Sequence, residues 1–264
     1  MISMVLILDK IKAEEVKALA AKGERLDGRG FKDYRDIKVD VRPLQNPEGS
    51  AMAHFGDTKV LVGVKVDLVK PFADRPTDGV ISVNCEFTPL AHPAFEPGPP
   101  KEESIELARV VDRAIRSAEV LPLAKLGENP TEDGRVLGVY VDVYPLDHNG
   151  NLTDAASLAA MCALKNTIVP KIEGDLLIRG EDGGKLPLQR QATTCSFEVV
   201  SGNIFVDATD IEEIASYGRV SIGVTDDGFL CAGQKSGAAG ISRDKLLELA
   251  DLALENRKFL FSKI

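Results

Sequence analysis

Several residue types that build metal and disulfide sites are scarce in this chain. Its 264 residues include no tryptophan, three histidines and four cysteines. Neither the cysteines nor the histidines are paired at metal-ligand spacing, so we expect no metal site and no cofactor. The apolar neighbours of each cysteine predict buried free thiols in a reducing compartment. These cysteines are Cys85, Cys162, Cys195 and Cys231.

Long hydrophobic runs and an excess of positive charge are also missing. The longest apolar stretches, such as Val60–Val64, are far too short to cross a membrane. Residues 1–8 lack the basic segment and the cleavage site of a signal peptide, so we expect a cytoplasmic protein without a membrane partner. The formal net charge of −9 repels nucleic acid on average. Any nucleic-acid role must therefore use a local basic patch or a basic partner.

Hydrophobic patterning predicts strands followed by helices, twice over. Strands are expected at 37–41, 51–55, 60–68, 80–87 and 136–145, and a second β-rich block at 174–232. Helices are expected at 9–22, 102–121, 154–168 and 242–257, with Asp9, Thr153 and Ser242 as N-caps and Pro170 beyond the third. This order favours an α+β fold over a doubly wound one. We divide the chain into an N-terminal helix (1–24) and two related halves (25–170 and 171–264).

The helix expected at 102–121 has two contrasting faces. At about 100° per residue, its apolar side chains fall on one side, and Arg109, Arg113 and Arg116 fall on the other. One interpretation is a solvated face with intrahelical ion pairs such as Asp112–Arg116. The other is a row of phosphate contacts, because guanidinium groups match phosphate oxygens.

An apolar run rises from a turn at Ser201-Gly202-Asn203 and ends in Asp207, with more carboxylates close behind. A carboxylate at the end of a buried strand can hold a metal or a catalytic proton. Asp210 and Glu213 fit a capping box that opens a short helix at 211–217. That interpretation leaves Asp207 without an explanation.

Motifs in a fixed order resemble the ribonuclease PH family over about residues 20–258. Arg25-Leu26-Asp27-Gly28-Arg29 with Arg35 is similar to its N-terminal signature, and Gly49-Ser50 with Gly56-Asp57-Thr58-Lys59-Val60 to its first hairpin. Residues 99–109 and Leu186-Pro187-Leu188 most resemble the non-catalytic ring subunit of the archaeal exosome. The resemblance implies two pseudo-symmetric βα halves of the ribosomal protein S5 domain 2-like type.

Active members of this family, which shorten RNA from its 3′ end by phosphorolysis, carry three features. They have an Arg-Arg pair before the first long helix, a Gly-Ser-Arg turn at the start of the central helix, and two aspartates six residues apart. By position, this chain has Glu102-Glu103, Leu152-Thr153-Asp154, and Ser201 with Asp207. Each like-charge contact with an anion costs on the order of 1–4 kcal/mol at about 4 Å. We therefore expect no catalytic residue here, with Asp207 a relic or a structural acceptor.

The resemblance also implies partners. A homologous catalytic ribonuclease PH-like subunit would alternate with this chain, as three heterodimers in a hexameric ring that takes RNA and leaves room for S1- or KH-type RNA-binding cap proteins. It places Arg109, Arg113 and Arg116 on an RNA-contacting helix. The expected function is thus a non-catalytic structural and RNA-binding subunit that supports its partner's active site in a phosphorolytic 3′-to-5′ RNA-degrading complex.

Two other functions remain open from the sequence. One is a self-sufficient phosphorolytic 3′-to-5′ exoribonuclease that forms a homohexamer and uses Asp207 with a metal held by neighbouring acids. The other is a small-molecule phosphotransferase on the same fold. That enzyme would need a glycine-rich phosphate loop, and no segment matches the required spacing.

Overall fold

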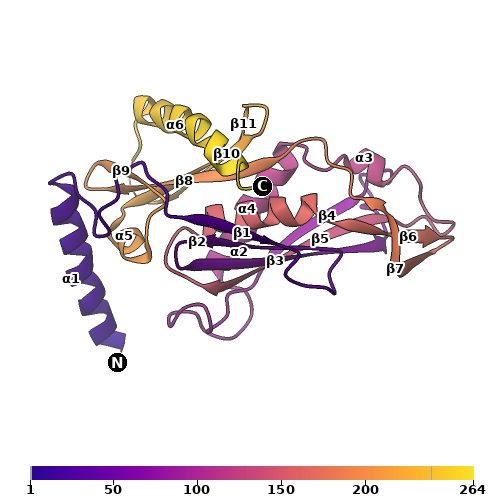
Figure 1. Ribbon diagram of the computed structural model, residues 1–264, viewed down its shortest axis with the longest axis horizontal. Helices are drawn as coiled ribbons and strands as arrows, with labels where there is room; N and C mark the ends of the chain where they lie inside the picture. The colour runs from indigo at the N-terminus through magenta and orange to yellow at the C-terminus, as the bar shows by residue number, and fades with distance from the viewer. Residues whose placement is uncertain (1, 239) are drawn as a thin grey trace.

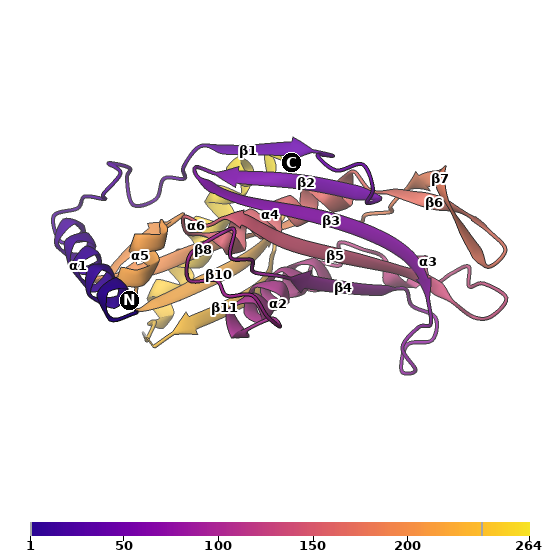
Figure 2. The same cartoon turned by 90° about the horizontal axis from the view of Figure 1, so that it is seen from below.

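Two β-sheets pack on opposite sides of two helices (Figures 1 and 2). The computed structural model describes residues 2–238 and 240–264. The helices are α1 (Ile2–Ala20), α2 (Glu102–Ser117), α3 (Leu123–Leu126), α4 (Leu152–Lys165), α5 (Asp210–Ala215) and α6 (Arg243–Phe261). Helix α4 contacts β2 and β3 of the first sheet and β8 of the second, while α2 contacts β4, β8 and β11.

The first sheet is built from the N-terminal half of the chain. Its strands lie in the order β1 (Ile37–Val41), β2 (Gly49–Phe55), β3 (Thr58–Val69), β5 (Val136–Asp147) and β4 (Val80–Cys85). Strand β4 runs parallel to β5, and the other neighbours are antiparallel. The β2–β3 turn pairs Phe55 with Thr58 through Gly56, whose φ of 56° suits a glycine, so the predicted hairpin is confirmed.

The second sheet comes from the C-terminal half. Its order is β11 (Leu230–Gly237), β10 (Gly218–Thr225), β8 (Ala192–Val200) and β9 (Asn203–Val206), and a separate hairpin joins β6 (Ile168–Glu173) to β7 (Leu176–Lys185). The β8–β9 turn has positive φ at Ser201 and Gly202, 49° and 82°, as a two-residue hairpin requires. The two sheets with their helices agree with the predicted α+β organisation.

Helix α4 is the centre of the core, as its sequence predicts. Every residue from Leu152 to Leu164 is buried, because the helix has a sheet on each side. Complete burial of a side chain such as Leu158 contributes about 1.5–3 kcal/mol. Strand β8 is buried on both faces: Thr194 and Ser196 contact α4, while Cys195 contacts Asn256 on α6.

Element boundaries correct several local predictions. Helix α1 begins at Ile2, so Asp9 lies inside it rather than at its cap. Helix α4 is capped by Asn151 in place of Thr153, because Asn151 adopts a left-handed φ of 53° and its side chain accepts from Asp154 N. The helix ends at Lys165, and Pro170 lies within β6.

The capping box of α5 is shifted by one residue from the predicted one. The N-cap is Thr209, and the reciprocal acceptor is Glu212, which receives a hydrogen bond from Thr209 N at 2.8 Å. Strand β4 ends at Cys85, two residues early.

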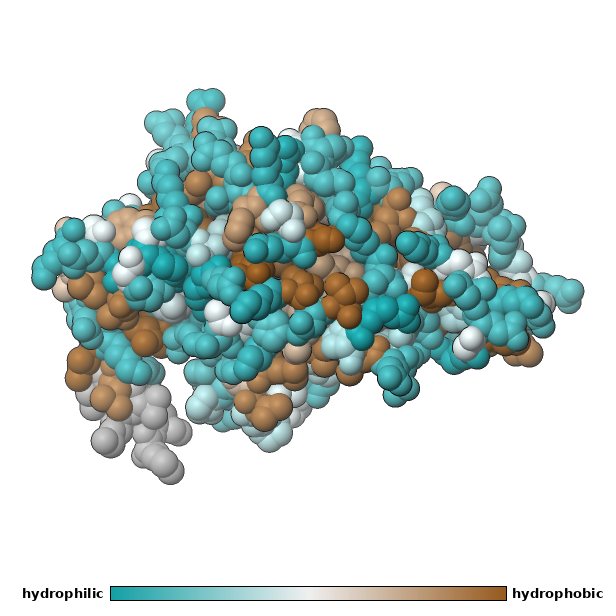
Figure 3. Space-filling model, in the orientation of Figure 1, coloured by the Kyte–Doolittle hydropathy of each residue, from teal (hydrophilic) through white to brown (hydrophobic). Residues whose placement is uncertain are grey.

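The outer surface is mostly hydrophilic on the face drawn in Figure 3, with apolar residues in small patches. Among the described helices, none combines the length and the apolar character that a membrane span requires.

Candidate functional site

The segment from Arg25 to Arg35 fastens the N-terminal part of the chain to the end of β9 and to α5. The guanidinium group of Arg25 donates to both carboxylate oxygens of Glu212, at 2.9 and 2.6 Å, and both side chains are buried. It also donates to the carbonyl oxygens of Val206 and Asp207, each at 3.0 Å. The Arg25–Arg29 motif therefore attaches the N-terminal segment to the end of β9 and to α5.

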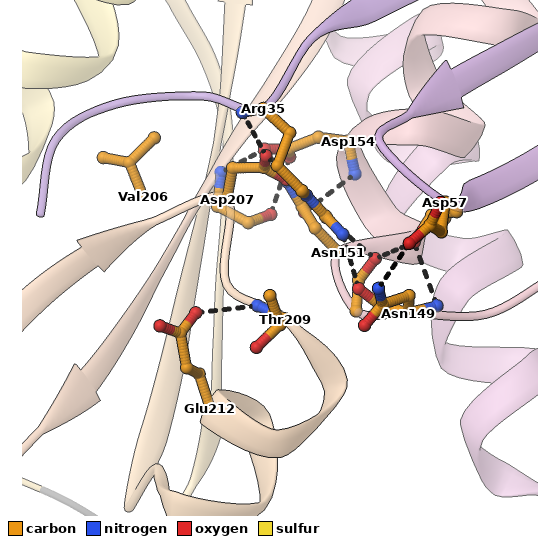
Figure 4. A network of polar contacts seen from close by, with 12 residues as sticks. Arg35, Asp57, Asn149, Asn151, Asp154, Val206, Asp207, Thr209 and Glu212 are labelled. Atoms are coloured by element: carbon orange, nitrogen blue, oxygen red, sulfur yellow. Dashed lines mark hydrogen bonds and ion pairs between the residues drawn. The ribbon is translucent and has the colours of Figure 1, made fainter. Parts of the chain in front are cut away.

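Asp207 is the hub of the same junction (Figure 4). Its carboxylate accepts from Arg35 N, Nε and Nη2 at 2.8, 2.9 and 2.7 Å, from Asn151 Nδ2 at 2.9 Å and from Arg29 Nη1 at 3.3 Å. Burial alone would raise the pKa of Asp207, but the hydrogen bonds and charge of Arg35 lower it below its ordinary value. With five donors, this carboxylate is engaged in structure.

Asp154 lies on the other side of Asn151 but faces β8. It accepts from Ser196 N and Oγ at 2.9 and 2.7 Å, from Thr194 Oγ1 at 2.9 Å and from Asn151 Nδ2 at 3.1 Å. Burial raises its pKa to about 6, and these hydrogen bonds oppose that rise. The sequence comparison predicts that Asp154 presents negative charge to a ligand at the start of α4. The carboxylate is fully buried, so it does not.

A cleft of about 230 Å³ opens where α2, the start of α4 and the second sheet meet. Its polar lining consists of Glu103, Glu106, His148, Thr153, Glu213, Arg219, Ser221, Gln234 and Ser236. The stacked rings of Phe87 and Phe95, with centroids 4.4 Å apart, form one wall. Burial lowers the pKa of His148 to about 4, so its imidazole is neutral at pH 7.

Glu213 binds two groups at this cleft that could otherwise bind an anion. Its carboxylate accepts from the backbone N–H of Asn151, the N-cap of α4, at 2.8 Å, and lies 2.6 Å from the guanidinium group of Arg219. Arg219 also binds Glu198 behind the cleft. The start of a helix is where backbone amides would bind an anion. Here the chain's own carboxylate occupies that place and engages the arginine that lines the cleft.

The predicted degenerate positions are not gathered in this cleft. Of them, Glu103, Leu152 and Thr153 line it, whereas Glu102 lines a separate depression along α2. Within the described residues, the cleft lining includes neither Ser201, which is exposed on the β8–β9 turn, nor Asp207. Ser201 and Asp207 therefore do not meet in this cleft, because the end of β9 faces the N-terminal segment.

Sequence reasoning missed the residues that do meet here. Glu213 and Arg219 lie in the cleft and, like the family's aspartates, are six residues apart. The sequence pattern places Glu213 in a capping box, which explains a carboxylate at this position without a cleft. The sequence feature that could have revealed its role is Arg219, the second residue of the next strand, β10. A basic residue at that position can pair with Glu213, and a capping box does not account for it.

The arginine stripe of α2 divides into two environments. Arg109 and Arg113 line a depression of about 320 Å³ together with Glu102 and Glu106, and Arg113 donates to Gln234 Oε1 at 2.7 Å. Arg116 pairs with Asp112 at 2.8 Å, the predicted intrahelical pair. Its Nη2 also donates to the carbonyl oxygen of Ile81 at 2.5 Å.

In the described part of the chain, no group of three His, Cys, Asp or Glu side chains is arranged so that it could hold a metal ion.

Known proteins match this chain over most of its length. Residues 33–170 match domain 1 of the 3′ exoribonuclease family, RNase PH, and residues 191–256 match its domain 2. The exosome complex component Rrp42 of Methanothermobacter thermautotrophicus is 39% identical over 258 residues, which cover 97% of this chain and 94% of that protein. Rrp42 of Thermococcus gammatolerans is 40% identical over 271 residues, covering 99% and 98%.

Among solved structures, a chain of the Archaeoglobus fulgidus exosome with RNA bound to the active site is 41% identical. It superimposes with a TM-score of 0.90 over 97% of this chain and 99% of that chain. A chain of an archaeal exosome core is 38% identical, with a TM-score of 0.84 and 96% of each chain covered. The chain therefore belongs to the 3′ exoribonuclease (RNase PH) family, among the relatives of the exosome complex component Rrp42.

Proposed function

We propose that this chain is a non-catalytic structural and RNA-binding subunit of an archaeal-type exosome, a phosphorolytic 3′-to-5′ RNA-degrading ring in the cytoplasm. The observation that carries the proposal is the position of Glu213. Its carboxylate holds both the amide at the start of α4 and the guanidinium group of Arg219. A phosphate anion would need those same two donors.

The charge of the cleft supports the absence of phosphorolysis. Phosphorolysis brings inorganic phosphate beside a phosphodiester, so an active site must supply positive charge to both anions. This cleft instead carries Glu103, Glu106 and Glu213, and its guanidinium group, from Arg219, is already paired. We infer that Glu213 and Arg219 occupy the positions of the two family aspartates, which would leave no carboxylate pair to promote the reaction.

The relatives support the ring. Proteins that match nearly the whole chain are named exosome components, and one matching structure is an exosome with RNA bound to its active site. We propose that this chain alternates with a homologous catalytic subunit in three heterodimers and supports that subunit's active site. S1- or KH-type RNA-binding proteins would cap the ring.

The RNA contacts proposed for this chain lie on α2. Arg109 and Arg116 are exposed, and Arg113 is half-buried, so all three can be reached from solvent. Arg116 is the strongest candidate because its guanidinium group is oriented by Asp112 and by the Ile81 carbonyl oxygen. A pre-oriented guanidinium group loses less conformational entropy when it binds a phosphate.

The decisive experiment measures phosphate-dependent shortening of a uniformly labelled single-stranded RNA. The purified chain alone should give none, and the chain mixed with its homologous catalytic subunit should give nucleoside diphosphates. The catalytic subunit alone serves as the control. Robust phosphorolysis by the pure single chain would contradict the proposal and favour the self-sufficient homohexamer.

A further inference from the structure

A second hollow, of about 540 Å³, lies at the C-terminal end of α2. Its polar lining is Arg75, Arg116, Glu119, Lys125 and Gln189. Its apolar lining is Ile81, Ile115, Leu121, Pro122, Leu123 and Ala124. We call this site the basic hollow. Figures 1 and 2 place α3, which forms one of its sides, at the end of the molecule away from α1 and α5.

The fold brings the three cations of the basic hollow together from separate segments. Arg75 lies in the loop between β3 and β4, and Lys125 lies on α3. Gly79 N donates to the Leu123 carbonyl oxygen at 2.7 Å, so the loop is attached to α3. A Cβ atom at Gly127 would lie 2.0 Å from the Thr77 carbonyl oxygen, which shows how closely the two segments pack. Backbone contacts therefore hold the loop that carries Arg75 against the helix that carries Lys125.

The charge of the basic hollow contrasts with the rest of the protein. Three cations, of which Arg116 is paired with Asp112, and the single carboxylate of Glu119 line it, in a chain whose net charge is −9. The side chains of Arg75 and Lys125 are exposed, and no ion pair of either occurs among the described residues. By contrast, Arg109 and Arg113 share their depression with two glutamates, Glu102 and Glu106. Positive charge available to a ligand is thus concentrated at the Arg116 end of α2.

We propose that the basic hollow binds two or three consecutive phosphates of single-stranded RNA, through Arg75, Arg116 and Lys125. This inference rests on the proposed function and extends the RNA-contacting surface beyond α2 to a loop and a second helix. Guanidinium and ammonium groups bind phosphate oxygens regardless of base identity. The apolar floor, including Ile115 and Leu121, offers a surface for a ribose or a base. Binding here is independent of RNA sequence.

The test uses the complete ring, assembled with the homologous catalytic subunit, in phosphate-free buffer so that RNA is bound without being shortened. The variant is the double substitution Arg75→Glu with Lys125→Glu, which leaves the α2 stripe untouched. The matched control is Arg243→Glu with Lys258→Glu, the same charge change on exposed residues of α6. Affinity for oligoadenylate and oligouridylate is measured by fluorescence anisotropy across a salt series.

The hollow variant should bind both RNAs at least about tenfold more weakly than wild type near 0.1 M salt. The slope of log affinity against log salt should fall in magnitude by about 1.4, because two phosphate contacts to a single strand are lost. The control variant should keep an affinity for both RNAs and a salt slope close to those of wild type, because it leaves Arg75 and Lys125 in place. Unchanged affinity and slope in an intact hollow-variant ring would overturn the inference.

Two other outcomes separate this inference from the function beneath it. If the hollow variant fails to assemble with the catalytic subunit while the α6 control assembles, the basic hollow is a protein contact and the inference is wrong. If the wild-type ring neither binds nor shortens RNA, the proposed function fails and the inference fails with it. If the wild-type ring shortens RNA and the hollow variant binds RNA as wild type does, the inference is wrong and the proposed function stands.

Discussion

Asp207 and Asp154 are fully buried carboxylates that share a hydrogen-bond donor, yet their surroundings give them opposite properties. Asn151 Nδ2 donates to both, at 2.9 and 3.1 Å. Arg35 and Arg29 contact Asp207, whereas the other donors to Asp154 are neutral groups of Ser196 and Thr194. The pKa of Asp207 is lowered, and that of Asp154 is raised to about 6.

The difference shows that hydrogen bonds alone do not offset the rise in carboxylate pKa that burial causes here. Both side chains accept at least four hydrogen bonds, so the arginine charge is what distinguishes them. A third carboxylate, Glu213, lies at the cleft with one guanidinium group and partial exposure. Asp207 and Glu213 therefore form a series of paired carboxylates, in which dependence on the cationic partner should fall with solvent exposure.

The largest effect is expected for Arg35→Met, which leaves Asp207 with one weaker cationic partner, Arg29, at 3.3 Å. Removing one partner of a buried ion pair costs about 3–5 kcal/mol, so the free energy of unfolding should fall by up to that amount, less what Arg29 retains. Urea denaturation measures it. The control is Arg190→Met, whose exposed ion pair with Asp227 spans 3.5 Å and should contribute less than about 1 kcal/mol.

A companion variant separates charge from lost packing. Adding Asp207→Asn to Arg35→Met removes the unpaired charge and should recover part of the lost stability. If Arg35→Met lowers the free energy of unfolding no more than the surface control does, Asp207 does not depend on its cationic partner. The arginine charge would then not explain the difference between Asp207 and Asp154.

The next effect is a pH dependence for Asp154 opposite in sign to that of Asp207. The pKa of Asp154 rises on folding from 3.8 to about 6, so the folded state holds the proton more tightly than the unfolded state. Its contribution to stability therefore decreases as pH rises from about 4 to about 6, by up to roughly 3 kcal/mol. The lowered pKa of Asp207 has the reverse consequence, with stability present above its unfolded pKa and lost as pH falls through its folded value.

Asp154→Asn tests this sign directly. The amide keeps the shape and cannot ionise, so the variant should gain stability relative to wild type as pH rises from about 4 to about 7. Urea midpoints across that range give the difference, with exposed Asp251→Asn as the control. A variant whose stability relative to wild type falls as pH rises through this range would show that the ionised form of Asp154 is the stabilising one.

Local features of this fold could be predicted from the sequence because they depend on neighbouring residues. The hairpin turns at Gly56 and Gly202 follow from glycine's access to positive φ, and the burial of α4 follows from its uniformly apolar sequence. Of the site, the α2 stripe and the position of Glu103 at the cleft could also be predicted.

The partners of the carboxylates could not be predicted because they are distant along the chain. Arg35 is 172 residues from Asp207, and Asn151 is 56 residues from it. A six-residue spacing by itself fits Ser201 with Asp207 as well as it fits Glu213 with Arg219. Only the fold decides which pair reaches the cleft, since β9 ends against the N-terminal segment and β10 begins beside α2.

The smallest effect on stability is expected for Glu213→Gln, at the exposed end of the series. Arg219 keeps Glu198 as a partner, and the glutamine oxygen can still accept from Asn151 N, so the loss should stay below about 1 kcal/mol.

Because one negative charge leaves the start of α4, the Glu213→Gln variant should bind inorganic phosphate more tightly than wild type in a thermal-shift titration, while Glu103 and Glu106 keep that binding weak. Glu119→Gln, which removes a carboxylate outside the cleft, is the control. A loss as large as that of Arg35→Met would instead make Glu213 a structural residue like Asp207, and its position could no longer be explained by the exclusion of phosphate from the cleft.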